Sequence, residues 1–279
     1  MGCSRRNITG LGLAAMLGGC QSWVPGRDPG ADGALDLYLL MGQSNMAGRG
    51  RVEPQDQQAD ARVVVLRSGG EWRQAIEPLH ADKPSVVGVG PGRSFGLAVA
   101  DRKAGRRIGL VPCAVGGSPI AAWQPGAVFE VEPGRLVHPF DDALLQMAQA
   151  SAAGRWRGIL WHQGESDSNE RDAPLYEERL RQLLLRLRAA LGDAQLPVLI
   201  GQMGRWPGKP WSAAKAQVDA AHQRVAQTLG HAAFVSAEGL GLHADGLQVH
   251  FDAAGARELG RRYAAALKQL QAGAAAGRE

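Results

Sequence analysis

The sequence has few of the residues that mark disulfide-rich, metal-binding or fibrous proteins. It contains only three cysteines in 279 residues, and aromatic residues make up 5%. It has neither a Cys-x-x-Cys pair nor a His-Glu-x-x-His stretch, the common zinc-binding patterns. Apolar residues at 45% and charged residues at 21% are ordinary for a globular domain. The composition therefore favours a globular protein, and we expect no metal and no other cofactor.

The excess of positive charge is small and dispersed. The formal net charge is +4, and the arginines that produce it are interleaved with acidic residues along stretches of helical period. No helix-turn-helix or zinc-knuckle pattern accompanies them. We therefore expect solvated helix surfaces and no nucleic-acid partner.

The first residues have the features of a targeting segment. Arg5 and Arg6 precede a short apolar run over residues 8–19, and the segment ends in Leu-Gly-Gly-Cys, which resembles a bacterial lipobox. The run is too short to span a bilayer comfortably. Residues 1–20 are therefore predicted to be a lipoprotein-type signal peptide, with Cys20 lipidated. The expected location is the periplasmic side of the envelope, reached by Sec or twin-arginine export.

The rest of the chain divides into a tether, one domain and a tail. Residues 21–34 are rich in Gly, Pro and Asp, as flexible tethers are. Residues 35–272 are predicted to form one globular domain, and residues 273–279 a frayed tail. With Cys20 acylated, Cys113 is the one cysteine left in the domain, so no internal disulfide is expected.

Short apolar runs alternate with longer stretches of helical period in this domain. This alternation predicts a parallel sheet with helices on both faces. The expected strands are 35–41, 62–66, 107–113, 158–162, 197–203 and 232–236. The expected helices lie near 94–104, 138–152, 180–191, 212–229 and 253–272.

The first expected strand ends in a serine-containing turn. In an open α/β sheet, ligands gather at the carboxyl ends of the strands. The stretch 42–46 reads Gly-Gln-Ser-Asn-Met and places Ser44 at the turn from strand to helix. A serine there presents its hydroxyl beside outward-pointing N–H groups, as a nucleophile and an oxyanion site require. The alternative is that Ser44 is a helix N-cap.

Two other strand ends also carry candidate groups. Gly116 and Gly117 follow one strand, and a glycine pair allows close backbone approach and exposes an N–H donor. Gln163 and Glu165 follow another; the amide could donate to an oxyanion and the carboxylate could orient a base. The alternatives are a plain glycine loop and solvated loop residues.

A histidine precedes the last expected helix. His250 stands just before it, and Asp252 is placed to be its N-cap. Histidine is the usual proton acceptor for a serine hydroxyl because its pKa lies near neutral pH. A structural histidine is the alternative. Together the four clusters supply a nucleophile, an N–H donor, an amide donor and a base.

These blocks resemble the SGNH, or GDSL-like, hydrolases, specifically the sialate O-acetylesterase-like branch that includes carbohydrate esterase family six. The Gly-Gln-Ser-Asn-Met block of this branch is intact. The resemblance spans about residues 35–270. The stretches that carry it are 42–46, 88–95, 115–118 followed by Trp123, 162–166 and 250–252.

The resemblance implies a flavodoxin-like three-layer α/β/α sandwich with a central parallel sheet, the SGNH hydrolase fold. It implies Ser44 as nucleophile and His250 as general base. The oxyanion hole would consist of the Ser44 N–H, an N–H of Gly116 or Gly117, and the Gln163 side chain. The side chains expected to contact substrate are Gln43, Asn45, Arg93 and Trp123.

The acid that orients the histidine departs from the superfamily pattern. The expected Asp position, three residues before His250, is Leu247, and Asp245 lies five residues away. Either a bulge brings Asp245 to the imidazole or Glu165 orients it, and we favour Glu165. Any carboxylate within reach can fix the tautomer and stabilise the imidazolium.

The expected activity is removal of O-acetyl groups from carbohydrates through an acyl-enzyme intermediate. Acetylated xylan fragments, sialic acids and related glycans all fit. The alternative is a catalytically silent carbohydrate-binding lipoprotein of the same fold. The expected partners are the acetylated carbohydrate and, through the lipid anchor alone, the membrane; the sequence does not indicate the oligomeric state.

Overall fold

The structure, a computed structural model, describes residues 34–101, 105–206, 210–243 and 249–276. The predicted signal peptide with Cys20, the predicted tether up to residue 33, and Asp245 lie outside the described residues. Across the described parts, no helix combines the length and the apolar character needed to cross a bilayer.

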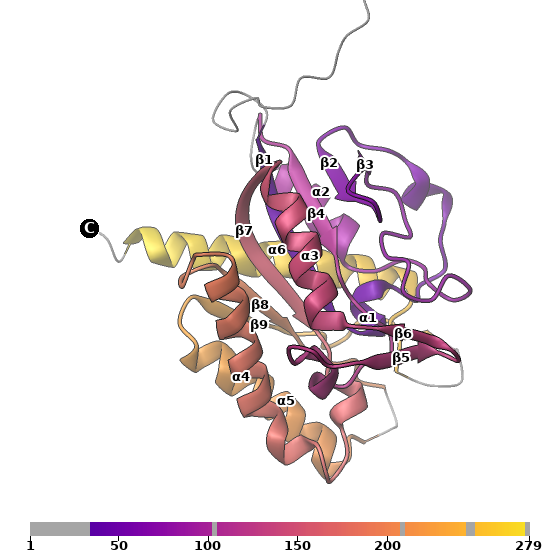
Figure 1. Ribbon diagram of the computed structural model, residues 1–279, viewed down its shortest axis with the longest axis vertical. Helices are drawn as coiled ribbons and strands as arrows, with labels where there is room; N and C mark the ends of the chain where they lie inside the picture. The colour runs from indigo at the N-terminus through magenta and orange to yellow at the C-terminus, as the bar shows by residue number, and fades with distance from the viewer. Residues whose placement is uncertain (1–33, 102–104, 207–209, 244–248, 277–279) are drawn as a thin grey trace, which may run out of the picture.

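One mostly parallel sheet forms the centre of the molecule (Figure 1). Its strand order is β3-β2-β4-β1-β7-β8-β9, and every neighbouring pair is parallel except β2 with β3. All six predicted strands are present, and the short antiparallel edge strand β3 is additional. The strands are β1 (Leu35–Gly42), β2 (Val63–Leu66), β3 (Trp72–Gln74), β4 (Ile108–Pro112), β7 (Gly154–His162), β8 (Val198–Gly201) and β9 (Ala232–Val235).

Helices cover both faces of this sheet. Helices α2 (Gly92–Ala100) and α6 (Ala253–Ala276) pack together on one face, where Tyr38 and Leu40 of β1 point. Alternate residues of β1, such as Leu39, face α3 (Pro139–Ser151), α4 (Ala173–Ala190) and α5 (Ala213–Thr228). Every residue of β1 is buried, as expected for a central strand covered on both sides. The predicted three-layer α/β/α class is therefore confirmed.

Short elements follow the carboxyl ends of the three central strands. Helix α1 (Ser44–Ala47) follows β1, and η3 (Glu165–Asp167) follows β7. After β4 come η2 (Ile120–Trp123) and a hairpin of β5 (Phe129–Glu132) and β6 (Arg135–Val137). A further 3-10 turn, η1 (Pro54–Gln57), lies between α1 and β2. Because β4, β1 and β7 are parallel neighbours, the segments after them meet at one edge of the sheet.

Candidate active site

Ser44 stands where β1 turns directly into α1. Gly42 permits this turn, because its φ is +130° and a Cβ there would lie 2.0 Å from the His162 carbonyl oxygen. Helix α1 begins at Ser44 itself, and Gln43 occupies the cap position without a side-chain cap bond. The N-cap alternative for Ser44 is therefore wrong. As the first helical residue, Ser44 has an N–H group without an intrahelical acceptor.

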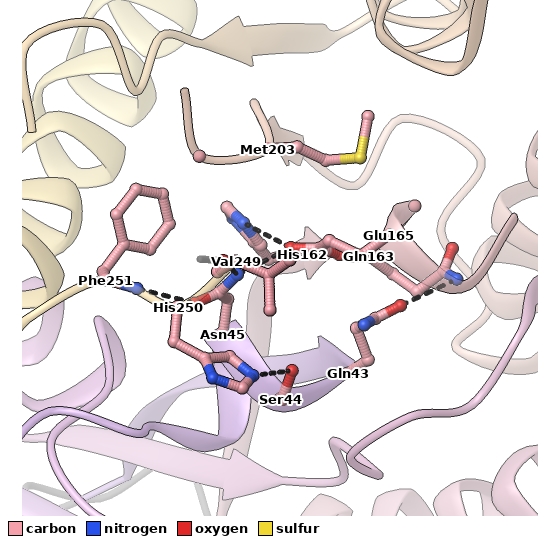
Figure 2. Close-up of polar contacts among 12 residues, drawn as sticks. Gln43, Ser44, Asn45, His162, Gln163, Glu165, Met203, Val249, His250 and Phe251 are labelled. Atoms are coloured by element: carbon pink, nitrogen blue, oxygen red, sulfur yellow. Dashed lines mark hydrogen bonds and ion pairs between the residues drawn. The ribbon is translucent and has the colours of Figure 1, made fainter. Parts of the chain in front are cut away.

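His250 meets Ser44 although 206 residues separate the two positions. Its Nε2 lies 3.0 Å from Ser44 Oγ (Figure 2). Ser44 and His250 are 6% and 9% exposed, and both line the pocket, so their contact is sheltered but still borders it. Asp252 caps the following helix as predicted, since its Oδ1 accepts a hydrogen bond from Gly255 N at 2.6 Å. The predicted nucleophile and base thus lie within hydrogen-bonding distance.

Asn45 fixes the segment that carries the imidazole. Its Oδ1 accepts from Phe251 N at 3.1 Å, and its Nδ2 donates to the Val249 carbonyl at 2.9 Å. The same Nδ2 donates to Glu165 Oε1 at 2.6 Å. Asn45 is 3% exposed and does not line the pocket. The expectation that Asn45 binds substrate is therefore corrected, because its whole amide is used to hold His250 in place.

Replacing Asn45 with alanine is expected to lower kcat about 10- to 100-fold with little change in KM, because small displacements of a catalytic group are costly. Steady-state kinetics on a chromogenic acetyl ester measures both constants. Asn45→Asp keeps the acceptor for Phe251 N but places a carboxylate against Glu165, so we expect it to be at least as damaging. An Asn45→Ala variant with unchanged kcat would contradict this positioning role.

Glu165 does not orient the imidazole by direct contact. Its Oε1 accepts from Asn45, its Oε2 has no hydrogen-bond partner, and none of the hydrogen bonds found in the described ranges joins it to His250. The preference for Glu165 as the orienting acid is therefore corrected. Among the hydrogen bonds of the described residues, its carboxylate is linked to the segment that carries His250 through Asn45. The other candidate, Asp245, lies outside the described residues.

The two glycines predicted as oxyanion donors differ in whether their N–H groups are already hydrogen-bonded. Gly116 N donates to Asp82 Oδ2 at 2.8 Å, and that carboxylate is also paired with Arg49 at 2.7 Å. The Gly116 N–H therefore already has an acceptor and is not free to bind an oxyanion. This corrects the expectation that Gly116 belongs to the oxyanion hole. Gly117, with φ +84°, lines the pocket, and within the described segments its N–H has no acceptor. Gly117 and Ser44 thus supply the two available backbone donors.

Gln163 is not available to an oxyanion. It is fully buried, and its Nε2 contacts Gln43 Oε1 at 3.1 Å, Ser118 O at 3.1 Å and Asp167 Oδ2 at 2.5 Å. An amide NH₂ has only two hydrogens, so these acceptors already saturate it. Tyr176 donates to its Oε1 at 2.8 Å. The predicted oxyanion role of Gln163 is corrected, because its side chain is a buried link between elements.

The region after β7 is a buried polar network rather than a solvated loop. His162 is fully buried, and burial, followed by the charge of Lys215, lowers its pKa to about 3. Burial also raises the pKa of Asp167 to about 6. His162 Nδ1 lies 3.1 Å from the Tyr263 hydroxyl, which donates to the Trp161 carbonyl. A neutral imidazole therefore lies beneath the site, and the solvated-loop alternative is wrong.

His222, whose Nε2 lies 2.9 Å from the Tyr176 hydroxyl, gives this buried region a testable dependence on pH. Burial lowers its pKa from 6.5 to about 3. The unfolded chain therefore binds this proton at a higher pH than the folded protein does, so stability is lost as pH falls from 6.5 towards 3. Replacing His222 with glutamine should lower the slope of the free energy of unfolding against pH by up to about 1.4 kcal/mol per pH unit in this range.

Urea unfolding of both proteins at a series of pH values measures the effect. The difference in free energy of unfolding between them should stay constant above pH ~7 and narrow below pH ~6.5. Parallel curves throughout this range would contradict the assignment of a neutral, buried His222.

Two other expected substrate contacts lie elsewhere. Trp123 is fully buried in the core, stacked edge-on against Trp161, with its Nε1 donating to Ser118 Oγ at 3.0 Å. Arg93, on α2, donates to the backbone carbonyls of Ala75 and Gln58. Neither lines the pocket. Both expectations are corrected, because the Trp123 side chain lies in the core and the Arg93 side chain is hydrogen-bonded to backbone carbonyls.

A pocket of about 750 Å³ opens at Ser44. Its walls include Arg49, Lys83 and His243, which the sequence analysis missed because they lie in loops without a motif or a period. Lys83 Nζ lies 3.9 Å from the place a Cβ of Gly117 would take, and no carboxylate in the described ranges pairs with it. Within those ranges, no three potential metal ligands are grouped as a metal site would require.

Comparison with known proteins places the chain in a family. The family described as "Carbohydrate esterase, sialic acid-specific acetylesterase" matches residues 34–269. The chain belongs to this family. This is a family of carboxylic ester hydrolases, so the predicted resemblance and the predicted class of enzyme are confirmed at that level.

Individual proteins that are similar to this chain in sequence or structure agree with this. A probable carbohydrate esterase of Arabidopsis thaliana, At4g34215, is 33% identical over 183 residues, which is 58% of this chain and 66% of the plant protein. The chain thus matches slightly less than two thirds of that relative. The structure of that plant protein superposes with a TM-score of 0.72 at 29% identity, covering 85% of this chain and 98% of the other.

Two more distant structures share the fold of this esterase family. XAC1771, described as a carbohydrate acetylesterase from Xanthomonas citri, has a TM-score of 0.65 at 22% identity, covering 85% of this chain and 57% of its own. NanS has a TM-score of 0.68 at 15% identity; the match covers 86% of this chain and 98% of the NanS chain. At these identities the likeness supports the α/β fold alone.

Proposed function

We propose that this member of the family is a serine esterase that removes O-acetyl groups from carbohydrates. The observation that carries the proposal is the 3.0 Å contact between Ser44 Oγ and His250 Nε2 at the wall of a pocket of about 750 Å³. A serine hydroxyl bonded to an imidazole beside unpaired N–H donors is the arrangement that acyl transfer requires.

The reaction proceeds in two steps. Ser44 Oγ attacks the acetyl carbonyl carbon while His250 Nε2 takes the hydroxyl proton, and the carbonyl electron pair moves onto oxygen. The N–H groups of Ser44 and Gly117 face that developing charge. Collapse breaks the bond to the sugar oxygen, which takes the proton from His250. Water, deprotonated by the same imidazole, then attacks the acetyl-serine; the Ser44 Oγ–carbon bond breaks, acetate leaves, and His250 returns the proton to Ser44 Oγ.

The pocket wall favours sugars that carry a negative charge. Among the described residues Lys83, beside Gly117, has no carboxylate partner, whereas Arg49 is already neutralised by Asp82. An unpaired cation next to the reacting centre attracts anionic substrates. Among the glycans considered, acetylated sialic acids fit this charge better than neutral acetylated xylan fragments do.

Acetate release from a panel of acetylated glycans tests the proposal. We expect release from acetylated sugars, faster for sialic acids than for neutral xylo-oligosaccharides, and loss of release in Ser44→Ala. If no glycan and no chromogenic acetyl ester yields acetate with folded protein, the esterase proposal fails and the silent carbohydrate-binding alternative is favoured. Faster release from neutral sugars would contradict the preference for charged substrates.

We further propose that the enzyme is an exported lipoprotein anchored through Cys20. The supporting observations are the two arginines, the short apolar run and the Leu-Gly-Gly-Cys ending in the sequence. When the full chain is expressed in a Gram-negative host, we expect radiolabelled palmitate in the wild type and none in Cys20→Ala. The matched variant Cys3→Ala should retain the label; equal labelling of wild type and Cys20→Ala would contradict the anchor.

A further inference from the structure

The pocket beside Ser44 is also bordered by the side-chain amide of Gln43. With Gly116 and Gln163 committed to other acceptors, the backbone supplies two donors, from Ser44 and Gly117. Gln43 also borders the pocket, directly before the serine. Figure 2 shows its side chain lying between Ser44 and Gln163.

The orientation of the Gln43 amide is set by its neighbours. Its Oε1 accepts from Gln163 Nε2 at 3.1 Å and from the backbone N–H of Ser166 at 3.3 Å. A backbone N–H can only donate, so the oxygen must face Ser166. The NH₂ group therefore points the other way. Within the described ranges it meets no acceptor, although Gln43 is only 4% exposed.

Gln43 Nε2 is not among the sealed polar atoms, so this donor is open to the pocket and can donate to a ligand bound there. The pocket is built for a group that becomes strongly accepting only during reaction, the carbonyl oxygen of the ester. Gln43 borders the pocket beside the serine that attacks this carbonyl, and the two anchors on its Oε1 keep the NH₂ fixed there. A fixed donor that strengthens its bond as charge develops lowers the barrier without tightening substrate binding.

We propose that Gln43 Nε2 is the third oxyanion donor, together with the N–H groups of Ser44 and Gly117. This inference rests on the proposed esterase function. As the Ser44 Oγ–carbon bond forms, the carbonyl electron pair moves to oxygen, and Gln43 donates to that oxygen until the sugar oxygen leaves. The role of Gln163 and Ser166 is to hold the Gln43 carbonyl.

The isosteric change Gln43→Glu tests this directly. Its carboxylate keeps an acceptor for Ser166 and Gln163 but replaces the donor with a negative oxygen facing the oxyanion. We expect kcat to fall about 100- to 1,000-fold with KM changed less than about threefold. Gln43→Met, which removes the donor without adding charge, should also lower kcat strongly. Gln149→Glu, exposed on α3, is the matched charge control and should leave both constants unchanged.

A thionoester substrate separates an electrostatic role from a structural one. Sulfur accepts hydrogen bonds poorly, so the wild-type enzyme should prefer the oxygen ester strongly, and both Gln43 variants, which keep only the two N–H donors, should show a clearly smaller preference. Far-ultraviolet circular dichroism and thermal unfolding show which of the two Gln43 variants are folded. One folded variant is enough for the test. Folded variants that keep kcat within threefold, or keep the full oxygen preference, overturn the inference. Inactive wild-type protein would instead refute the esterase proposal itself.

Discussion

Ser44→Ala should lower kcat for acetyl ester hydrolysis by about 10⁴-fold or more, because removal of the nucleophile leaves only the oxyanion donors and binding to assist water. The free energy of unfolding should change little, since the lost hydroxyl is bonded only to His250 among the contacts described for it. Initial-rate kinetics on a chromogenic acetyl ester, with urea unfolding alongside, measures both.

Ser166→Ala provides a matched control. This serine also lines the pocket, but its hydroxyl donates to the Gly117 carbonyl. We expect its kcat to fall by less than about tenfold, because it holds no reacting atom. If Ser44→Ala retained more than about one hundredth of the wild-type kcat, a serine nucleophile at this position would be refuted.

His250→Ala is expected to cost nearly as much, about 10³- to 10⁶-fold in kcat, because the serine loses its proton acceptor and the sugar oxygen its proton donor. The residues of such a pair act as a unit, so their losses are not additive. The double variant Ser44→Ala/His250→Ala should therefore be no slower than the slower single variant.

Added imidazole gives a second test of the histidine. His250 lines the pocket, so truncation leaves space that free imidazole can enter. We expect imidazole to raise the rate of His250→Ala in proportion to its concentration and to leave Ser44→Ala unchanged. Additive losses in the double variant, or imidazole acting equally on both single variants, would contradict a shared role.

The layered fold could be predicted from the sequence because its central elements satisfy strong local rules. A strand such as β1, covered on both faces, reads as a continuous apolar run, and the leucines of α4 recur at helical spacing. The hairpin of β5 and β6 was missed because its strands are short and poorly buried, with Glu130 and the apolar Leu136 both exposed. Strand β3, three residues at the sheet edge, has too little pattern to detect.

The candidate site was predicted only in part. Ser44 and His250 stand at element ends that chain order and fold class bring together, and the structure places them in contact. The state of each hydrogen-bond donor could not be predicted, because it depends on distant partners. Gly116 is consumed by Asp82, 34 residues away in sequence. A sequence motif shows which amides are near the site but not which of them remain unpaired.

The same limit explains the misplaced substrate contacts. Trp123 follows the glycine block closely in sequence, yet η2 turns its ring into the core against Trp161. Lys83 comes from a loop with no motif, yet its ammonium reaches Gly117. The direction of a side chain after a strand end is therefore decided by tertiary packing, and the local sequence pattern does not predict it.

Treatment of the protein with a fluorophosphonate, followed by peptide mass spectrometry to locate the adduct, tests whether Ser44 is a nucleophile activated by His250. We expect one phosphonylated residue, Ser44, and much slower labelling in His250→Ala. A protein that releases acetate while Ser44 stays unmodified, or that labels equally fast without the imidazole, would contradict this expectation.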